Sequence, residues 1–390
     1  AAQMTQAQEE KPVIETRDIG TSEIKLDGVL DEEVWRSVTP ATGFIQEDPD
    51  EGEACTEKSE IYVIYNEDNL YIGAKLYDSD PSGILAYQKR RDAWLVTDDR
   101  FMLILDTFLD ERTGYFFETN PAGLLGDGIL GSGGHWNVNK SWDGIWDVRV
   151  VIDDEGWSAE IVIPFRTLNF DPELDTWGIN FQRTIRRKNE DARWSGYRRN
   201  QNLTEPVHAG RVTGLKNLTR GKGLEIKPYA IVKNQWSSNG IPANPQDTGL
   251  DLSFNITSGL KGSFTYNTDF AEAEVDDRRV NLTRFPMRFQ EKRAFFLEGS
   301  GVYSFANRSG VTPFFSRRIG LSEGSQIPIT YGGRLTGQVG DYEIGMINAR
   351  TESLGDIPAE NFNVARIKRS LFRESYLGLV YTGRSADADS

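Results

Sequence analysis

Aromatic side chains in two glycine- and aspartate-rich stretches are the residues whose chemistry is easiest to foresee in this sequence. Trp94 shortly precedes the run DDRFMLILD, and Trp136 lies in SGGHWNVNKSWDGIWD between His135 and Asn137. An exposed indole offers a flat apolar face on which a sugar ring can stack, while His and Asn supply hydrogen-bond partners for hydroxyl groups. We therefore take these four residues, with Tyr115 in RTGYFFETN, as candidate carbohydrate contacts.

The same aromatic residues also have a structural interpretation, because tryptophan is the largest apolar side chain that a core can bury. Trp142 and Trp146 flank an Asp-Gly turn, and Trp146 opens an alternating run. We expect both to pack in the core and to anchor the loop. For Trp94 and Trp136, ligand contact and packing at a sheet edge remain alternatives.

Acidic residues before one predicted strand are candidates for metal binding. Calcium takes about six to eight oxygen ligands, which clustered aspartates can supply. Asp92, Asp98 and Asp99 lie within eight positions of one another and are the candidate ligands. Aspartates also cap turns, and no loop with EF-hand spacing is present. Ca²⁺ is thus left open, and no other cofactor is expected.

Few residue patterns in the chain point to catalysis. A glycosidase needs two carboxylates at a defined separation, and among 59 acidic residues such a pair can always be imagined. The sequence has no Gly-x-Ser-x-Gly elbow, no His-Glu-x-x-His and no phosphate-binding loop. We expect a binding protein rather than an enzyme, with a hydrolase of glycosyl bonds as an alternative.

The elements that must position these residues are predicted to be strands. A chain of 390 residues with 38 glycines and 11% aromatic residues favours an all-β protein of two domains. Its net charge of −15 argues against nucleic acid as a partner, since duplex binding needs a basic face. Short alternating runs indicate a β-sandwich over residues 21–220; they lie at 60–66, 70–77, 100–108, 114–119, 145–152, 156–163 and 177–186.

The remaining segments differ from this pattern. Residues 1–20 are polar and are predicted to be a disordered lead-in left after signal cleavage. From 221 to 390, longer runs alternate between an apolar and a small polar face, interrupted by a charged insert at 269–305. Such a dyad fits a soluble sheet, with its polar face in water, or an outer-membrane barrel, with its apolar face in lipid.

A basic stretch, RTIRRKNEDARWSGYRR at 183–199, opposes the overall acidity. Alternation places Arg183 on the apolar face that Ile179 and Phe181 share. The rest fits either a solvated edge that discourages strand aggregation or a contact with anionic groups, and the first is favoured.

Two resemblances extend these expectations. The runs IKLDGVLDEEVW, YVIYNEDNLYIGAKLYDSD, WLVTDDRFMLILDT and DEGWSAEIVIPFRTL resemble, in order and spacing, the family 9 carbohydrate-binding modules. That resemblance implies a β-sandwich, two aromatic residues that clamp a sugar, and acidic residues that hold structural calcium. Trp94 best matches the first of the two aromatic positions.

The second resemblance covers the rest of the chain. NTDFAEAEVDDRRVNLTRF and FQEKRAFFLEG are similar to the segment that follows this module in uncharacterised bacterial outer-membrane proteins labelled membrane-associated hydrolases. It implies an outer-membrane β-barrel from about residue 221, surrounded by lipid. A finished barrel of this kind is expected to end in an aromatic residue, which GRSADADS lacks, so we expect either a fragment or an incomplete barrel.

Together these features predict a carbohydrate-binding sandwich, in the periplasm or at the surface, attached to an outer-membrane barrel of a Gram-negative-type bacterium and serving in glycan capture or uptake. A second hypothesis is that the sandwich binds no sugar and acts as a structural or docking cap of the barrel.

Overall fold

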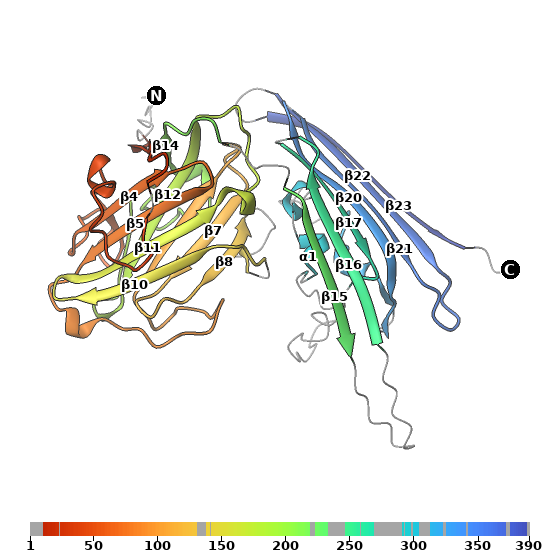
Figure 1. Ribbon diagram of the computed structural model, residues 1–390, viewed down its shortest axis with the longest axis horizontal. Coiled ribbons are helices and arrows are strands. Elements are labelled where there is room, and N and C mark those ends of the chain that lie inside the picture. Colours follow the sequence, from red (N-terminus) through yellow and green to blue (C-terminus); the bar gives the residue numbers. More distant parts are fainter. Residues whose placement is uncertain are drawn as a thin grey trace, which may run out of the picture. The chain divides into compact units, whose positions relative to one another are not determined.

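The chain divides into two compact units, Ala1–Arg220 and Gly221–Ser390, each built mainly of antiparallel strands (Figure 1). The computed structural model describes residues 11–22, 24–130, 138–140, 142–218, 223–232, 246–257, 259–268, 291, 293–297, 299–303, 313–322, 325–340, 342–371 and 375–387. Among these residues, no helix has the length and apolar character needed to cross a membrane. The all-β prediction is confirmed.

The first unit contains two sheets. The larger sheet has, in spatial order, β1 (Val13–Glu15), β14 (Gly210–Thr213), β12 (Thr176–Ile185), β6 (Arg100–Asp106), β7 (Gly114–Thr119), β8 (Gly126–Leu130) and β9 (Val138–Asn139), with β13 (Glu190–Arg193) joining β12 to β3 (Ile45–Asp48). The smaller sheet has β10 (Asp147–Asp153), β11 (Gly156–Pro164), β5 (Asn69–Tyr77), β4 (Ser59–Tyr65) and β2 (Arg17–Asp18). Single 3-10 turns lie in the connections between strands: η1 (Trp35–Ser37), η2 (Pro81–Gly83), η3 (Phe165–Thr167), η4 (Arg186–Lys188) and η5 (Pro206–His208).

One apolar core unites the two sheets. Alternate side chains of β6, such as Leu103, and of β11, such as Ile161, belong to the same buried cluster. The other face of β6 is covered as well, because Met102 and Ile104 pack in a separate cluster with Phe116. A strand buried on both faces reads as a continuous apolar run, which explains FMLIL at 101–105. The predicted β-sandwich is confirmed.

Part of the predicted disordered lead-in is ordered, so that expectation is wrong for residues 11–18. Strand β1 pairs parallel to β14, and β2 pairs parallel to β4. Ile14 is buried, and the Thr16 hydroxyl donates to the Val63 carbonyl at 2.8 Å. These strands form because distant sheet edges offer them backbone partners, which a local pattern does not reveal. Residues 1–10 lie outside the described part of the chain.

The second unit is a seven-stranded antiparallel sheet. Its order is β15 (Glu225–Val232), β16 (Gln246–Asn255), β17 (Leu260–Tyr266), β20 (Ile329–Val339), β21 (Tyr342–Thr351), β22 (Glu360–Leu371) and β23 (Ser375–Ala386). The described residues of this unit also form a small pair, β18 (Leu321–Ser322) and β19 (Ser325–Gln326), and the short helical turns α1 (Ala294–Leu297), η7 (Ser300–Tyr303) and η9 (Ser316–Arg318). Within the described residues, β15 and β23 end the sheet, and a closed barrel stays a prediction.

One face of this sheet carries polar residues and a covering segment. Phe295 and Tyr303, from α1 and η7, form a buried cluster with Ile329 and Ile347 of the sheet. The Arg334 guanidinium on β20 donates to the Phe295 carbonyl, which ties the segment to the strands. Most of the predicted charged insert at 269–305 lies outside the described residues.

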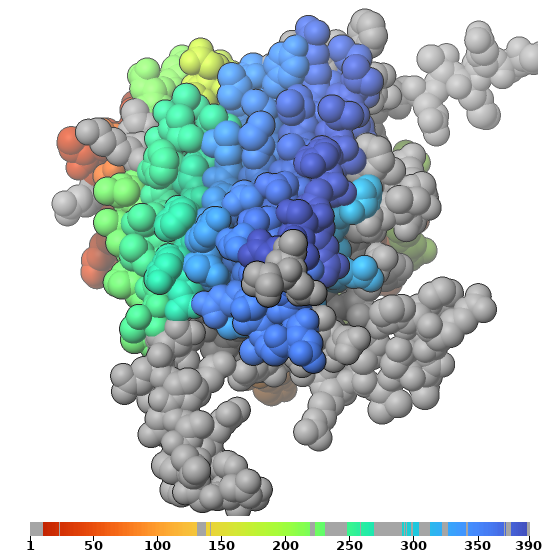
Figure 2. All heavy atoms as spheres, turned by 90° about the vertical axis from the view of Figure 1, so that its right-hand side faces the viewer, coloured from red at the N-terminus to blue at the C-terminus, as the bar shows by residue number. Residues whose placement is uncertain are grey.

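The opposite face is apolar and exposed. Figure 2 looks onto this side, where the strands follow one another from green to blue. Large exposed side chains occur on all seven strands: Ile226, Phe254, Phe264, Tyr266, Tyr331, Tyr342, Met346, Ile367, Leu377, Leu379 and Tyr381. The dyad pattern of the sequence therefore marks two chemically distinct faces of one sheet.

Candidate functional site

The loop over residues 84–99, between η2 and β6, is fixed by buried carboxylates. The Asp98 carboxylate accepts hydrogen bonds from the Tyr87 and Gln88 amides and from the Asn120 side chain, at 2.7–2.8 Å. Burial alone would raise the pKa of Asp98, but these hydrogen bonds outweigh it and lower the pKa below its ordinary value. The Asp98 carboxylate thus holds the loop in place by binding backbone amides of the same loop.

Asp99 fastens the same loop to a neighbouring segment. Its two oxygens accept from the Leu85 amide at 2.6 Å and from the Arg186 amide at 3.1 Å. Both Asp98 and Asp99 are buried among these N–H donors. Their observed role is to shape the loop.

Trp94 points outward from this fixed loop. Its neighbours Ala93 and Leu95 are buried in a small cluster with Leu124, while 64% of Trp94 is exposed. Because the two flanking side chains are anchored inward, the extended backbone between them turns the indole toward solvent. Tyr87 and Val96 are also exposed on this loop.

A lysine from β9's end lies over the Trp94 ring. The Nζ atom of Lys140 is 4.9 Å from the ring centroid and forms an ion pair with the buried Glu118 carboxylate. Glu118 stands at the end of β7, opposite Gly126 in the β7–β8 pair. The pairing of the strands therefore brings Glu118 and Lys140 together next to the Trp94 ring.

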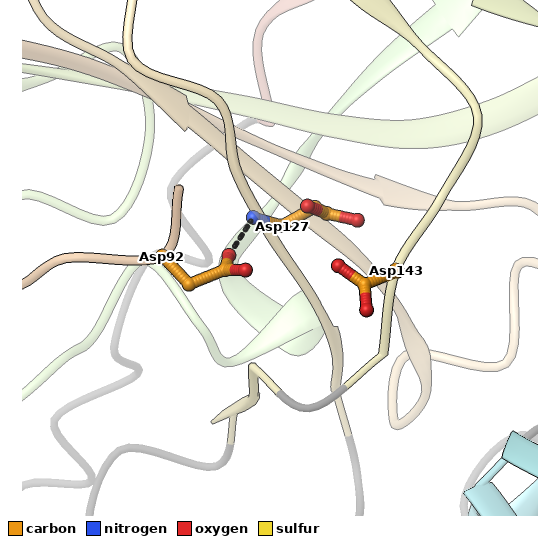
Figure 3. A group of neighbouring side chains, drawn as sticks. All are labelled: Asp92, Asp127 and Asp143. Atoms are coloured by element: carbon orange, nitrogen blue, oxygen red, sulfur yellow. Dashed lines mark hydrogen bonds between the residues drawn. The ribbon is translucent and has the colours of Figure 1, made fainter. Parts of the chain in front are cut away.

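Three aspartates, one of them from the same loop as Trp94, converge in one cluster (Figure 3). Oxygens of Asp92, Asp127 and Asp143 lie within 4.8 Å of one another, and the Asp127 amide donates to the Asp92 carboxylate at 3.0 Å. Burial raises the pKa of Asp127 to about 6, and burial also raises the pKa of Asp92.

The Arg91 guanidinium contacts all three of these carboxylates. Its Nη2 atom lies 2.6 Å from Asp127 Oδ1, and its Nε atom lies 2.9 Å from Asp143 Oδ1 and 3.6 Å from Asp92 Oδ2. A positive charge of the protein thus already stands among the oxygens that a cation would use.

The sequence-predicted metal candidates separate in the structure. Among the described residues, Asp92 converges with Asp127 and Asp143, whereas Asp98 and Asp99 belong to no such group. The calcium that the sequence resemblance implied does not fit this arrangement, because the guanidinium occupies the same oxygens. No step of the proposed function uses a metal ion.

The other aromatic candidates have different surroundings. Tyr115 is buried in the core, its ring centroid 5.1 Å from that of Trp142, and its hydroxyl accepts from the Asn169 amide at 2.7 Å. Trp142 and Trp146 belong to the same core, as predicted. Trp136, His135 and Asn137 lie outside the described residues.

The basic stretch at 183–199 is used internally. Arg183 is almost completely buried on the core face of β12, as alternation predicted, and donates to the Lys58 and Tyr77 carbonyls. Arg187 and Lys188 pair with Glu57 at 2.8 and 2.5 Å. These two cations are neutralised by a carboxylate distant in sequence rather than solvated, whereas Arg198 and Arg199 of the same stretch are exposed.

Five charged residues in or around loop 84–99 were missed from the sequence: Arg91, Glu118, Asp127, Lys140 and Asp143. The available signal was weak, because single charged residues in loops usually face solvent. The pairing of β7, β8 and β9 brings Glu118, Asp127 and Lys140 together, and loop 84–99 adds Arg91.

Comparison with known proteins gives two partial likenesses. Residues 222–350 match the family model described as a domain of unknown function, DUF5916. No curated protein matches the chain.

Solved structures similar to the chain include a carbohydrate binding module of family 9 from Caldicellulosiruptor kristjanssonii. In complex with cellotriose it is 15% identical, covers 53% of this chain and 95% of its own, and has a TM-score of 0.39. In complex with glucose it is 16% identical, covers 52% of this chain and 95% of its own, and has a TM-score of 0.37.

Proposed function

We propose that the first unit binds carbohydrate by stacking a sugar ring on Trp94. The observation that carries this proposal is an indole that is 64% exposed on a loop whose own residues are buried on either side of it. An exposed aromatic side chain on a rigid loop loses little entropy when a ligand covers it, because its surroundings are already ordered. The sequence resemblance to sugar-clamping modules supports the same function.

The neighbouring charges suit the recognition of hydroxyl groups. The Asp143 side chain is 68% exposed, and Lys140 lies over the ring. In the proposed complex the sugar covers the free face of the Trp94 ring, and its hydroxyl groups donate to the Asp143 carboxylate. Binding involves no covalent step, and the residues named hold the ring rather than transform it.

The test is a glycan array, followed by calorimetry of the purified full chain with any glycan that binds. Trp94→Ala should weaken binding about tenfold or more, because stacking contributes on the order of 1 kcal/mol beyond the area buried. Trp94→Phe should lose less, since a smaller aromatic face remains. Ile152→Ala, a change of another exposed apolar residue on β10, should leave affinity unchanged. Equal affinity of the wild type and Trp94→Ala would exclude this site.

For the second unit we propose that the sheet is part of an outer-membrane barrel wall, with the sandwich in the periplasm or at the surface. Alternate residues of β23, such as Leu377, Leu379 and Tyr381, are 59–72% exposed on the apolar face, while the opposite face carries buried polar groups. An apolar outer face with a polar inner face is the arrangement of transmembrane strands. Glycan capture or uptake would combine both units.

Membrane association can be tested with vesicles of phosphatidylethanolamine and phosphatidylglycerol. The full chain should float with the vesicles, and Leu379→Arg should weaken this association, because a lipid-facing arginine costs about 2–4 kcal/mol near the midplane. Ile152→Arg on the sandwich is the matched control. A chain that stays in the aqueous fraction would contradict the proposal.

The two tests also separate the alternative functions. A chain that floats with vesicles but binds no glycan would favour the sandwich as a structural or docking cap. Release of reducing ends from a bound glycan would favour a glycosyl hydrolase.

A further inference from the structure

The guanidinium of Arg91 stands at the centre of a carboxylate cluster that would otherwise suit a divalent cation. We propose that Arg91 is the built-in cation of loop 84–99: it takes the place of a metal ion and locks Asp92, Asp127 and Asp143 together. This inference concerns the architecture of the loop and does not depend on sugar binding.

The contacts of Arg91 join three separate chain segments. Besides the three carboxylates, its Nη2 atom donates to the Gly144 carbonyl at 3.1 Å. The Gly144 amide in turn donates to the Asp127 carboxylate, and the Asp127 amide donates to Asp92. Residues 91–92, 127 and 143–144 thereby form one closed set of contacts around the guanidinium.

The burial of Asp127 makes a compensating charge necessary. This side chain is completely buried, and a buried carboxylate without a cation or hydrogen-bond donors is strongly destabilising. Asp143 is largely exposed and Asp92 is intermediate, so the three carboxylates form a path from the interior to the surface. Arg91, whose side chain is 36% exposed, reaches the buried end of that path with its Nη2 atom, 2.6 Å from Asp127 Oδ1.

A loop held by an arginine does not depend on the calcium concentration, whereas a loop held by a calcium ion does. Calcium would require about six to eight oxygens at roughly 2.3–2.6 Å and would be lost to a chelator. The guanidinium is covalently part of the chain, stays protonated, and directs several N–H groups toward planar carboxylates. The loop that carries Trp94 should therefore keep its shape at any calcium concentration.

Thermal unfolding of the full chain with CaCl₂ or EDTA tests the proposal. For the wild type, neither 5 mM EDTA nor 5 mM CaCl₂ should change the melting temperature of the first unit by more than about 1 °C, an order-of-magnitude limit set against the linkage effect of a bound ligand. A larger decrease in EDTA, or a larger increase in CaCl₂, would overturn the proposal, since it would reveal a metal ion that the native loop uses.

The variants Arg91→Met and Arg90→Met form the matched pair. Arg90 is the adjacent exposed arginine, and its replacement should be nearly neutral. Arg91→Met removes the charge but keeps an unbranched stem, and should lower the melting temperature by about 5 °C or more because Asp127 loses its compensation. Equal melting temperatures for the two variants would overturn the proposal.

The same variant gives a second, independent measurement. With the guanidinium gone, the three carboxylates should accept Ca²⁺, so that CaCl₂ raises the melting temperature of Arg91→Met while leaving the wild type unchanged. If Arg91→Met does not fold alone, refolding in CaCl₂ takes the place of the thermal shift. Failure of Ca²⁺ to stabilise or refold this variant would overturn the idea that Arg91 occupies a cation position.

Discussion

The ammonium group of Lys140 lies 4.9 Å from the centroid of the Trp94 ring and is at the same time paired with the buried carboxylate of Glu118. One cation thus connects the exposed aromatic residue of the loop to the interior of the larger sheet. A cation over an indole is attracted by the ring quadrupole, and the ion pair fixes where that cation stands. The orientation of the Trp94 ring therefore depends on a residue of β7.

Lys140→Met should destabilise the first unit more than the loss of a surface ion pair would. Glu118 is 4% exposed, and removing its partner leaves a buried carboxylate, at a cost of about 3 kcal/mol. The double variant Lys140→Met/Glu118→Gln should recover part of that loss. Urea unfolding of the single and double variants gives the coupling energy, and strictly additive effects would contradict this pairing.

Glu57→Gln should destabilise the first unit by an amount that depends on pH. Burial alone would raise the pKa of Glu57, but hydrogen bonds from Lys188 and Ser79 outweigh it and lower the pKa to about 2. A carboxyl group whose pKa is lower in the folded state stabilises the protein above its unfolded pKa and loses this effect as the pH falls toward 2. We expect the free energy of unfolding of the wild type to exceed that of Glu57→Gln by about 2 kcal/mol at pH 7 and by little near pH 2.

Urea unfolding of both proteins at several pH values measures this difference. Glu173→Gln, at an exposed turn position, is the control. A constant difference between the wild type and Glu57→Gln from pH 7 to pH 2.5 would argue against the ion-pair network as its cause.

Adjacent glycines on β20 should respond in opposite ways to alanine. A Cβ atom on Gly332 would lie 3.0 Å from the Phe295 ring and from Thr265, whereas one on Gly333 would meet nothing within 4 Å. Gly332→Ala should therefore cost about 1–3 kcal/mol through overpacking against the covering segment. Gly333→Ala should be neutral or slightly stabilising. Thermal unfolding compares them, and equal effects would show that Phe295 does not press on this strand.

Glu160→Ala should loosen the segment before the first hairpin. The fully buried Glu160 carboxylate accepts from the Asp27 and Gly28 amides at 2.8 and 2.7 Å and from the Trp35 indole at 3.3 Å. Its removal leaves the Asp27 and Gly28 amides without this acceptor, at a cost of about 2–3 kcal/mol, while the Trp35 indole keeps its hydrogen bond to Glu32 at 3.1 Å. Amide hydrogen exchange over residues 24–37 should accelerate, while Glu173→Ala should not change it.

Local chemistry made the strands of the sandwich predictable. Alternation over 60–66 and 70–77 predicted the hairpin that forms as β4 and β5. Its turn is local too, because the Asn66 side chain accepts from the amides of Asp68 and Asn69 at 3.0 and 2.8 Å. Interactions over so few residues can be recognised from neighbouring residues in the sequence. Alternation likewise placed Arg183 on the core face of β12.

The partners of charged residues were decided only by the tertiary structure. From the sequence, the cations at 183–199 suggested a solvated edge, and Asp92 suggested a group with Asp98 and Asp99. In the fold, Arg187 and Lys188 pair with Glu57 from the loop before β4, and Asp92 lies beside Asp127, Asp143 and Arg91. Ion pairs join whichever segments become neighbours, and that depends on strand order rather than on spacing along the chain.

By itself, then, the sequence determined the elements, with their alternation and their turns, and predicted Trp142 as a core residue, whereas it left Trp94 between ligand contact and packing at a sheet edge. The tertiary structure decided that Trp94 is exposed, and it placed Lys140 over the Trp94 ring and Arg91 among three carboxylates. The physical reason is range. Backbone geometry and side-chain alternation act over a few residues, whereas burial and charge compensation arise only after segments separated by dozens of residues have packed together.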